Sequence, residues 1–268
     1  MSSLPIALVT GGSHGVGYDA ARALLDDGFV VVLHARTSEQ SWDAVQRLVA
    51  GGADPTRVHP VAADFASLDS VTLLARQVAA EHPVLDLLVN AATIVGSDQC
   101  VITEDGNELA LQVNYLAPVL LTRGLEEPMG RASAPRVINL SSELHRGGSL
   151  SWNDFNRSRR YTKLSAFAQS KLALTMFTNA LAEANAVTAV SVDPGSADPR
   201  LLRLNGTWAK AAHDGGTVLA RLGTGDLVNG AYYSRLQPVL PSPRVSDQRA
   251  VQHLLTLTDS RLQLDDGV

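Results

Sequence analysis

The sequence has one cysteine, no basic stripe and no long apolar run, and each shortage excludes a class of protein. Cys100 is the single cysteine, which excludes an intrachain disulfide or a metal site built on several cysteines and fits a reducing cytosol. The net charge is -5 with no basic stripe, so we expect no nucleic acid partner. Apolar runs stay short, and residues 1–5 carry no basic charge. We therefore expect a cytoplasmic protein without a signal peptide or membrane span, and no metal.

Short β-branched runs alternate along the chain with longer helical patterns. We predict strands at 6–10, 30–34, 58–62, 85–90, 137–141, 187–192 and 230–234, and helices at 16–27, 38–50, 68–81, 106–123, 162–184 and 247–258. Most of the predicted strands are apolar on both faces, as buried parallel strands are. This alternation predicts an α/β protein with right-handed βαβ units and a doubly wound parallel sheet, the Rossmann fold.

Domain organisation is simple. We find no internal repeat and no linker, so we predict one domain over residues 1–268. The segment 200–228 contains helical stretches broken by glycines and lies between the last two predicted strands. It is our candidate for a mobile substrate lid.

A glycine-rich loop follows the first predicted strand and precedes a helix. Its sequence, Thr-Gly-Gly-Ser-His-Gly-Val-Gly at 10–17, allows a tight turn that brings backbone N–H groups to a pyrophosphate at a helix N-terminus. We predict that the dinucleotide contacts Thr10, Gly11, Ser13, His14, Gly15, Val16 and Gly17. The competing interpretation is an ordinary glycine-rich turn, in which His14 is a partly exposed loop histidine.

Arg36 follows the second predicted strand, where an NAD site typically has an acidic residue for the ribose hydroxyls. A guanidinium suits a 2′-phosphate instead, so we predict NADP(H) rather than NAD(H). The alternative is that Arg36 is a solvated loop charge.

Further candidate cofactor residues follow the third and fourth predicted strands. Asp64 and Phe65 end the third, where the Asp64 carboxylate could accept from the adenine amino group or cap the next helix. Asn90, Ala91 and Ala92 end the fourth, and small residues there let the backbone approach the ribose.

These features together resemble the short-chain dehydrogenase/reductase superfamily over nearly the whole chain. The matching elements are the loop at 10–17, Asn90-Ala91-Ala92 for the Asn-Ala-Gly motif, Asn114, the strand that leads to Ser142, and Pro194-Gly195. Within the superfamily, segments 140–145, 169–173, 229–233 and 241–243 resemble the retinol-dehydrogenase-like branch.

The resemblance implies roles for the catalytic residues. In the superfamily a tyrosine protonates the substrate carbonyl, a lysine binds the nicotinamide ribose and lowers the pKa of the tyrosine, a serine orients the substrate and an asparagine holds a water. Lys171, Ser142 and Asn114 match the last three, and Pro194-Gly195 matches the loop beside the cofactor. Phe167 stands where the tyrosine is expected, four residues before Lys171.

Phenylalanine cannot donate a proton, so the source of the proton is in doubt. A spacing of four puts Phe167 and Lys171 on one helix face, and we expect the Phe167 ring to point toward the cleft. The other interpretation is a core aromatic without a chemical role. Tyr161, six residues upstream, is a candidate replacement acid, although six is not a helical spacing. Pro199 is a second departure, because the loop usually has a threonine there.

Three functions fit this sequence. The first is an NADPH-dependent reductase of a small organic substrate that does not need the tyrosine, such as an aromatic or polycyclic ketone, quinone or iminium of secondary metabolism. The second is a non-redox cyclase or dehydratase on the same fold, and the third a catalytically inactive NADP-binding protein. Superfamily members are often dimers or tetramers, so a homo-oligomer is a further expectation, without a membrane partner.

Overall fold

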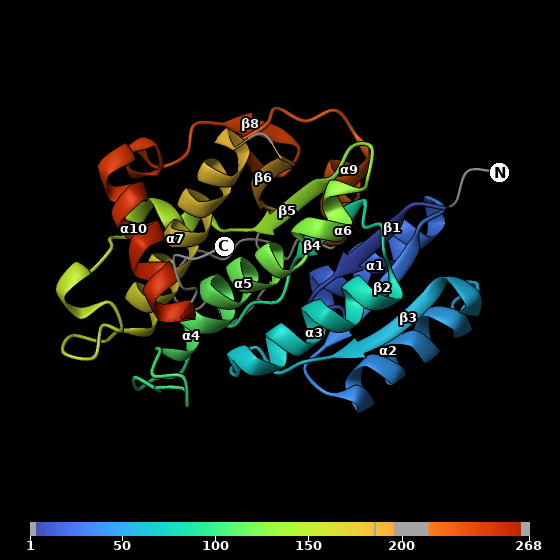
Figure 1. Ribbon diagram of the computed structural model, residues 1–268, viewed down its shortest axis with the longest axis horizontal. Helices are drawn as coiled ribbons and strands as arrows, with labels where there is room; N and C mark the ends of the chain where they lie inside the picture. The colour runs from blue at the N-terminus through green and yellow to red at the C-terminus, as the bar shows by residue number, and fades with distance from the viewer. Residues whose placement is uncertain (1–3, 185, 196–213, 264–268) are drawn as a thin grey trace.

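The computed structural model describes residues 4–184, 186–195 and 214–263 (Figure 1). In this part of the chain, eight strands form one sheet in the order β3-β2-β1-β4-β5-β6-β7-β8. The strands are β1 (Ile6–Val9), β2 (Val30–Ala35), β3 (Val58–Ala62), β4 (Leu87–Asn90), β5 (Arg136–Leu140), β6 (Thr188–Asp193), β7 (Tyr232–Ser234) and β8 (Gln237–Val239). The first seven are parallel, and β8 pairs antiparallel with β7. The predicted doubly wound parallel sheet in a single domain is confirmed.

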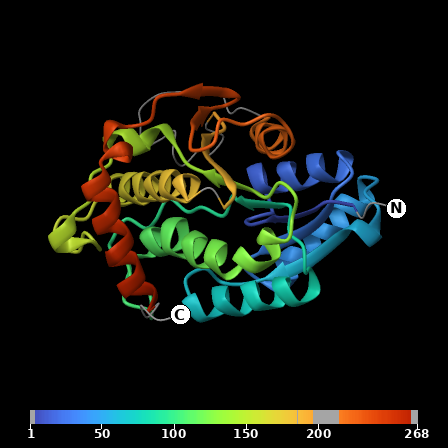
Figure 2. The same cartoon turned by 45° about the horizontal axis from the view of Figure 1, so that its top comes forward.

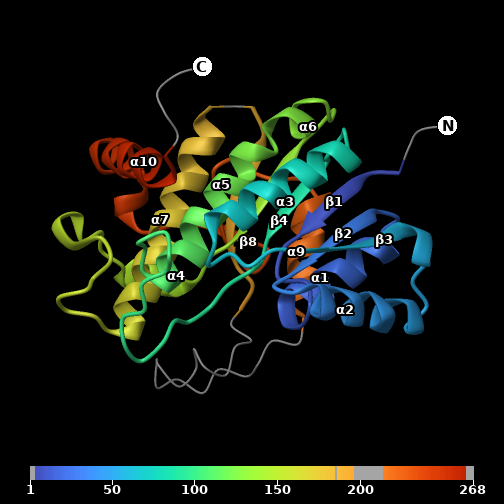
Figure 3. The same cartoon turned by 60° about the horizontal axis from the view of Figure 1, so that its bottom comes forward.

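Helices cover both faces of the sheet. One face carries α1 (Gly15–Asp26), α2 (Ser38–Ala50) and α9 (Gly215–Thr224), and the other carries α3 (Leu68–Glu81), α5 (Ala117–Gly124) and α7 (Lys163–Glu183). In Figure 2, α1 and α9 lie above the sheet and α3 and α5 below it. At the end away from β3, α10 (Gln248–Leu262) packs against α7 (Figure 3). No helix in the described residues is both long and apolar enough to cross a bilayer.

Shorter elements complete the described chain. They are η1 (Pro55–Arg57), α4 (Leu109–Leu111), η2 (Gln112–Leu116), α6 (Glu126–Gly130), η3 (Glu143–Gly147), η4 (Trp152–Asp154) and η5 (Pro243–Ser246).

Apolar side chains on both faces of the strands build the core. In β1, Ala7 and Val9 belong to the apolar cluster under α1, α2 and α9, whereas Leu8 belongs to the cluster under α3 and α5. All three side chains are fully buried. This two-sided burial is why the strand reads as an unbroken apolar run.

Two predicted segments differ from the structure. The predicted helix at 106–123 is divided into α4, the π-helical turn η2 and α5, and π turns often occur at functional sites. Residues 215–224 of the predicted lid are helix α9, which packs on α1: a Cβ on Gly216 would lie 2.4 Å from the Ala20 nitrogen. This part of the segment belongs to the core layer, and residues 200–213 lie outside the described residues.

Candidate active site

A cavity of about 770 Å³ lies at the carboxyl ends of the strands. It is beside β1 and β4, which are neighbours in the sheet: the strands that follow β1 extend the sheet to one side, and those that follow β4 extend it to the other. This is the topological switch point at which doubly wound folds bind ligands. The predicted residues that line it are Gly11, Ser13, His14, Gly15, Val16, Gly17, Arg36, Asp64, Phe65, Ala91, Ala92, Ser142, Phe167, Lys171 and Pro194. The cavity therefore brings together the predicted dinucleotide loop and three of the predicted catalytic positions.

The glycine loop packs tightly against the end of β4. Gly11 has a φ of +67°, and a Cβ there would lie 2.7 Å from Ala92 Cα. Beneath the loop, the buried Thr10 hydroxyl accepts from Ala91 N at 3.0 Å and from Ala92 N at 3.1 Å. Thr10 does not line the cavity but joins β1 to β4. The loop leads into α1, whose N-terminal N–H groups suit an anion.

His34 is a site residue that the sequence reasoning missed. Its Nε2–H donates to Ala63 O at 2.9 Å, and its Nδ1 accepts from Gly11 N at 3.2 Å. The ring stacks on Phe65 with centroids 4.5 Å apart, and burial lowers the pKa of His34 to about 4. A neutral imidazole therefore fixes the glycine loop to the end of β3. The sequence feature that could have identified His34 is its position as a polar residue near the end of the otherwise apolar strand β2.

Arg36 and Asp64 form an ion pair at the outer end of the cavity. Arg36 Nε lies 3.0 Å from Asp64 Oδ2, and the two side chains are 72% and 40% exposed. The described residues give the Nη groups of Arg36 no hydrogen-bond acceptor, so they are available to a ligand. The cap of α3 is Ser67, whose hydroxyl accepts from Ser70 N, and not Asp64.

Lys171 and Phe167 occupy the inner end of the cavity, one turn apart on α7. Both side chains are 1% exposed. Lys171 Nζ donates to Leu140 O at 2.6 Å and lies 5.6 Å from the Phe167 ring centroid. Burial lowers the pKa of Lys171 to about 7, and Asp193 opposes this shift.

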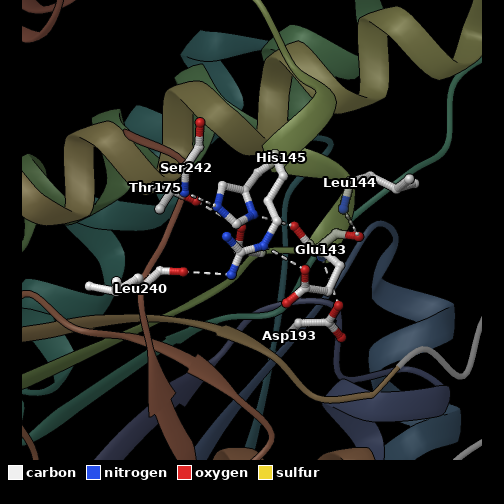
Figure 4. Close-up of polar contacts among 10 residues, drawn as sticks. Glu143, Leu144, His145, Thr175, Asp193, Leu240 and Ser242 are labelled. Carbon is white, nitrogen blue, oxygen red and sulfur yellow. Dashed lines mark hydrogen bonds and ion pairs between the residues drawn. The ribbon is translucent and has the colours of Figure 1, made fainter. Parts of the chain in front are cut away.

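The segment after β5 positions Ser142, whose Oγ accepts from Leu144 N at 3.3 Å. Hydrogen bonds that involve Asp193, His145 and Ser242 hold this segment in place (Figure 4). Asp193 Oδ2 accepts from Glu143 N at 2.7 Å. His145 donates through Nδ1 to Ser142 O at 2.7 Å, and its Nε2 accepts from Ser242 N at 3.0 Å. Neither Asp193 nor His145 stood among the predicted site residues.

Two predicted asparagines lie behind the cavity wall. Asn114, in η2, accepts through Oδ1 from Ile94 N at 2.8 Å and donates through Nδ2 to Ile94 O at 2.9 Å. Asn90 donates to Asn139 Oδ1 at 2.9 Å. Both amides support the backbone around the site and are absent from its lining.

Tyr161 and Gly195 also lie outside the cavity lining. The Tyr161 hydroxyl donates to Ser97 O at 2.9 Å, and burial raises the pKa of Tyr161 to about 12. The structure therefore does not bring Tyr161 to Lys171. Gly195 N donates to Asp193 Oδ1 at 2.8 Å, and Pro199 lies outside the described residues.

Comparison with known proteins identifies the family. The sequence profile of the short chain dehydrogenases matches residues 5–208, so the chain belongs to this family of oxidoreductases. Retinol dehydrogenase 13 of Mus musculus is 33% identical over 273 residues, covering 93% of this chain and 81% of the relative. The predicted superfamily is confirmed, with retinol dehydrogenases among the relatives.

Solved structures agree with the fold. An uncharacterised protein from Mycobacterium paratuberculosis superposes with a TM-score of 0.80 at 24% identity, over 99% of this chain and 98% of the other. A metagenomic short-chain oxidoreductase in complex with NADP gives a TM-score of 0.65 at 27% identity, over 90% of this chain and 100% of the other.

Proposed function

We propose that the protein is an NADPH-dependent reductase of a small organic substrate and works without the tyrosine acid of its family. The observation that carries the proposal is one cavity that joins the glycine loop to Ser142, Phe167 and Lys171. A bound nicotinamide supplies hydride. The chain's own residues bind and position the reactants.

The residues present fit a dinucleotide. A side chain at Gly11 would collide with Ala92, so the loop needs glycine there to pack on β4, whereas the space at Gly15 is free of atoms within 4 Å and leaves the N-terminus of α1 open to a phosphate. Arg36 favours a 2′-phosphate, because its ion pair uses Nε and leaves the planar Nη groups for charge-assisted bonds. NADP(H) is therefore the proposed cofactor, in keeping with the NADP carried by the metagenomic oxidoreductase.

We place Phe167 in the position of the family tyrosine, because it lies one helical turn before Lys171 and lines the same cavity. General acid catalysis is worth about 10²–10⁴-fold. A substrate limits this loss if it carries its own acidic hydroxyl or delocalises the negative charge that develops on oxygen. Quinones, and aromatic or polycyclic ketones with a phenolic hydroxyl beside the carbonyl, meet one of these conditions.

The lining of the inner cavity suits such a substrate. Ile94, Leu109 and Val113 contribute apolar side chains to the cavity that Phe167 also lines, and an aromatic ring can stack on the Phe167 ring. We also propose that the protein is cytoplasmic and forms a homo-oligomer.

The test is NADPH consumption against a panel of quinones, aromatic ketones and simple aliphatic ketones. We expect NADPH-dependent reduction of the quinones or aromatic ketones, and slower reduction of the aliphatic ketones. Product without NADPH consumption would indicate a cyclase or dehydratase. NADPH binding without any product would indicate a binding protein.

A further inference from the structure

The described residues place six titratable side chains in the cavity lining: His14, His34, Arg36, Asp64, Lys171 and Asp193. The first four lie on the glycine loop and the ends of β2 and β3, where the resemblance puts the adenosine half of the cofactor. Lys171 and Asp193 remain at the inner end. The two carboxylate oxygens of Asp193 accept from Glu143 N and Gly195 N, so Asp193 is a bound acceptor and not a proton donor.

The Lys171 ammonium has N–H donors that no described residue binds. An ammonium has three N–H donors, and the described residues offer Nζ a single hydrogen-bond acceptor, Leu140 O at 2.6 Å. No described carboxylate forms an ion pair with it. Two donors are therefore left for groups that enter the cavity, such as a ribose hydroxyl and the oxygen of a substrate.

We propose that Lys171 is itself the general acid of the reaction, delivering a proton from Nζ to the substrate oxygen directly or through one water molecule. This inference rests on the proposed reductase function. A bound NADPH would supply the hydride that forms a C–H bond at the carbonyl carbon, and the π electrons of the C=O bond would move to oxygen. The oxygen takes the proton of the Lys171 ammonium, which leaves a neutral amine, NADP⁺ and an alcohol. Solvent then returns a proton to the amine.

The surroundings of Lys171 favour this proton transfer. Burial places the pKa of Lys171 near neutrality, where a group serves best as an acid at physiological pH. Asp193, at the end of β6, is the one neighbouring charge that raises this pKa. Other groups close by are already engaged: Glu143 pairs with Arg146, both ring nitrogens of His145 are hydrogen-bonded, and the hydroxyl of Tyr115 bonds Thr258.

The inference also narrows the substrate class. A ketone, aldehyde or quinone takes up a proton on oxygen when it accepts hydride, whereas an iminium carbon needs none. The inner cavity therefore fits a carbonyl or quinone better than an iminium.

The test compares Lys171→Ala with wild type at saturating NADPH, on a carbonyl or quinone that the wild type reduces. We expect kcat to fall by about 10²–10⁴-fold, and added ethylamine to restore part of it in the space that the lysine stem leaves. Across a series of small amines, the restored rate should follow the amine pKa, and ethanol should restore nothing. NADPH fluorescence checks that the variant still folds and binds the cofactor.

Two further variants sharpen the result. Lys163→Ala removes a lysine from the same helix that pairs with Asp98, and its kcat should equal that of wild type. Lys171→Arg keeps a cation that does not lose its proton. Its kcat should be low and independent of pH, whereas the wild-type kcat should fall about tenfold per pH unit above the apparent pKa of Lys171.

The outcomes separate the two proposals. If Lys171→Ala keeps kcat within threefold of wild type, or if its rate does not respond to amines, Lys171 is not the acid although the protein is still a reductase. If wild type oxidises no NADPH with any carbonyl or quinone, the reductase function and this inference are both overturned.

Discussion

At the scale of single residues, our proposal depends on one oxygen atom, the hydroxyl that a tyrosine would carry at position 167. Phe167 keeps the ring at the inner wall of the cavity, 5.6 Å from Lys171 Nζ, but it cannot donate a proton. Ser142 and Lys171 line the same cavity. In our proposals the family's tyrosine acid is absent, Lys171 delivers the proton, and Ser142 keeps its role in positioning the substrate.

Phe167→Tyr should consequently raise the activity on simple ketones, which we expect the wild type to reduce slowly. The new hydroxyl would act as an acid beside Lys171, so the gain should stay below the roughly 10²–10⁴-fold that a general acid contributes where none is present. NADPH consumption with an aliphatic ketone measures the gain. Tyr161→Phe is the companion variant, and it should keep kcat within a few-fold because Tyr161 bonds Ser97 O outside the cavity. A loss of 10²-fold or more in Tyr161→Phe, with cofactor binding intact, would show that the acid is Tyr161.

Arg36 governs the choice of cofactor in our proposal. Arg36→Ala should weaken NADPH binding by about 1.5–3 kcal/mol, the value of a hydrogen bond to a charged group, and leave NADH binding little changed. Titration of both cofactors by fluorescence measures the two dissociation constants. An equal loss for NADPH and NADH would contradict the assignment of Arg36 to the 2′-phosphate.

At the scale of elements, the end of β2 is joined to the glycine loop and to β3 by the neutral ring of His34. Its pKa is about 4 in the folded protein against an ordinary 6.5. Between these values the unfolded chain binds the extra proton, so stability is lost as the pH falls from about 6.5 to about 4.

His34→Gln should therefore flatten the pH dependence of unfolding over this interval. The shift corresponds to an upper limit of about 3 kcal/mol, and urea unfolding at several pH values measures it. His82 and His145 also have lowered pKa values through burial, so part of the dependence should remain in the variant. An unchanged slope in His34→Gln would show that His34 does not carry the effect.

The sequence predicts those elements whose signal is local. Buried strands such as β1 are apolar runs, and the glycine loop is recognised between a strand and a helix. The strand β8 escapes this reasoning because Gln237, Pro238 and Val239 are all exposed and form a strand only by pairing with β7. The π turn η2 escapes it too, since Asn114 there bonds the distant backbone of Ile94.

The same distinction applies to the site. Gly11 and Arg36 could be predicted because each follows a strand end in a known pattern. His34 and Asp193 could not, since their roles come from partners far along the chain, such as Ala63 O for His34 and Glu143 N for Asp193. Tyr161 was a candidate by closeness in sequence, yet the loop before α7 directs its hydroxyl to Ser97.

At the scale of the whole molecule, the strand order brings segments from both halves of the chain together at the carboxyl ends of the strands. The glycine loop comes from the first half, and Lys171 and Pro194 come from the second. A dinucleotide that contacts all of them binds the folded chain and not the unfolded one. Its binding free energy therefore adds to the free energy of unfolding.

NADPH at 100 times its dissociation constant should stabilise the protein by about 2.7 kcal/mol, which raises the Tm by roughly 5–10 °C for a domain of this size. Differential scanning fluorimetry measures the shift and needs no substrate. At the same concentration, NADH should give a smaller shift, because it lacks the phosphate that Arg36 would bind. Arg36→Ala should bring the NADPH shift down to the NADH value, since the variant cannot tell the two cofactors apart. If NADPH and NADH stabilise the wild type equally, the proposed preference for NADP(H) is wrong even though the fold binds a dinucleotide.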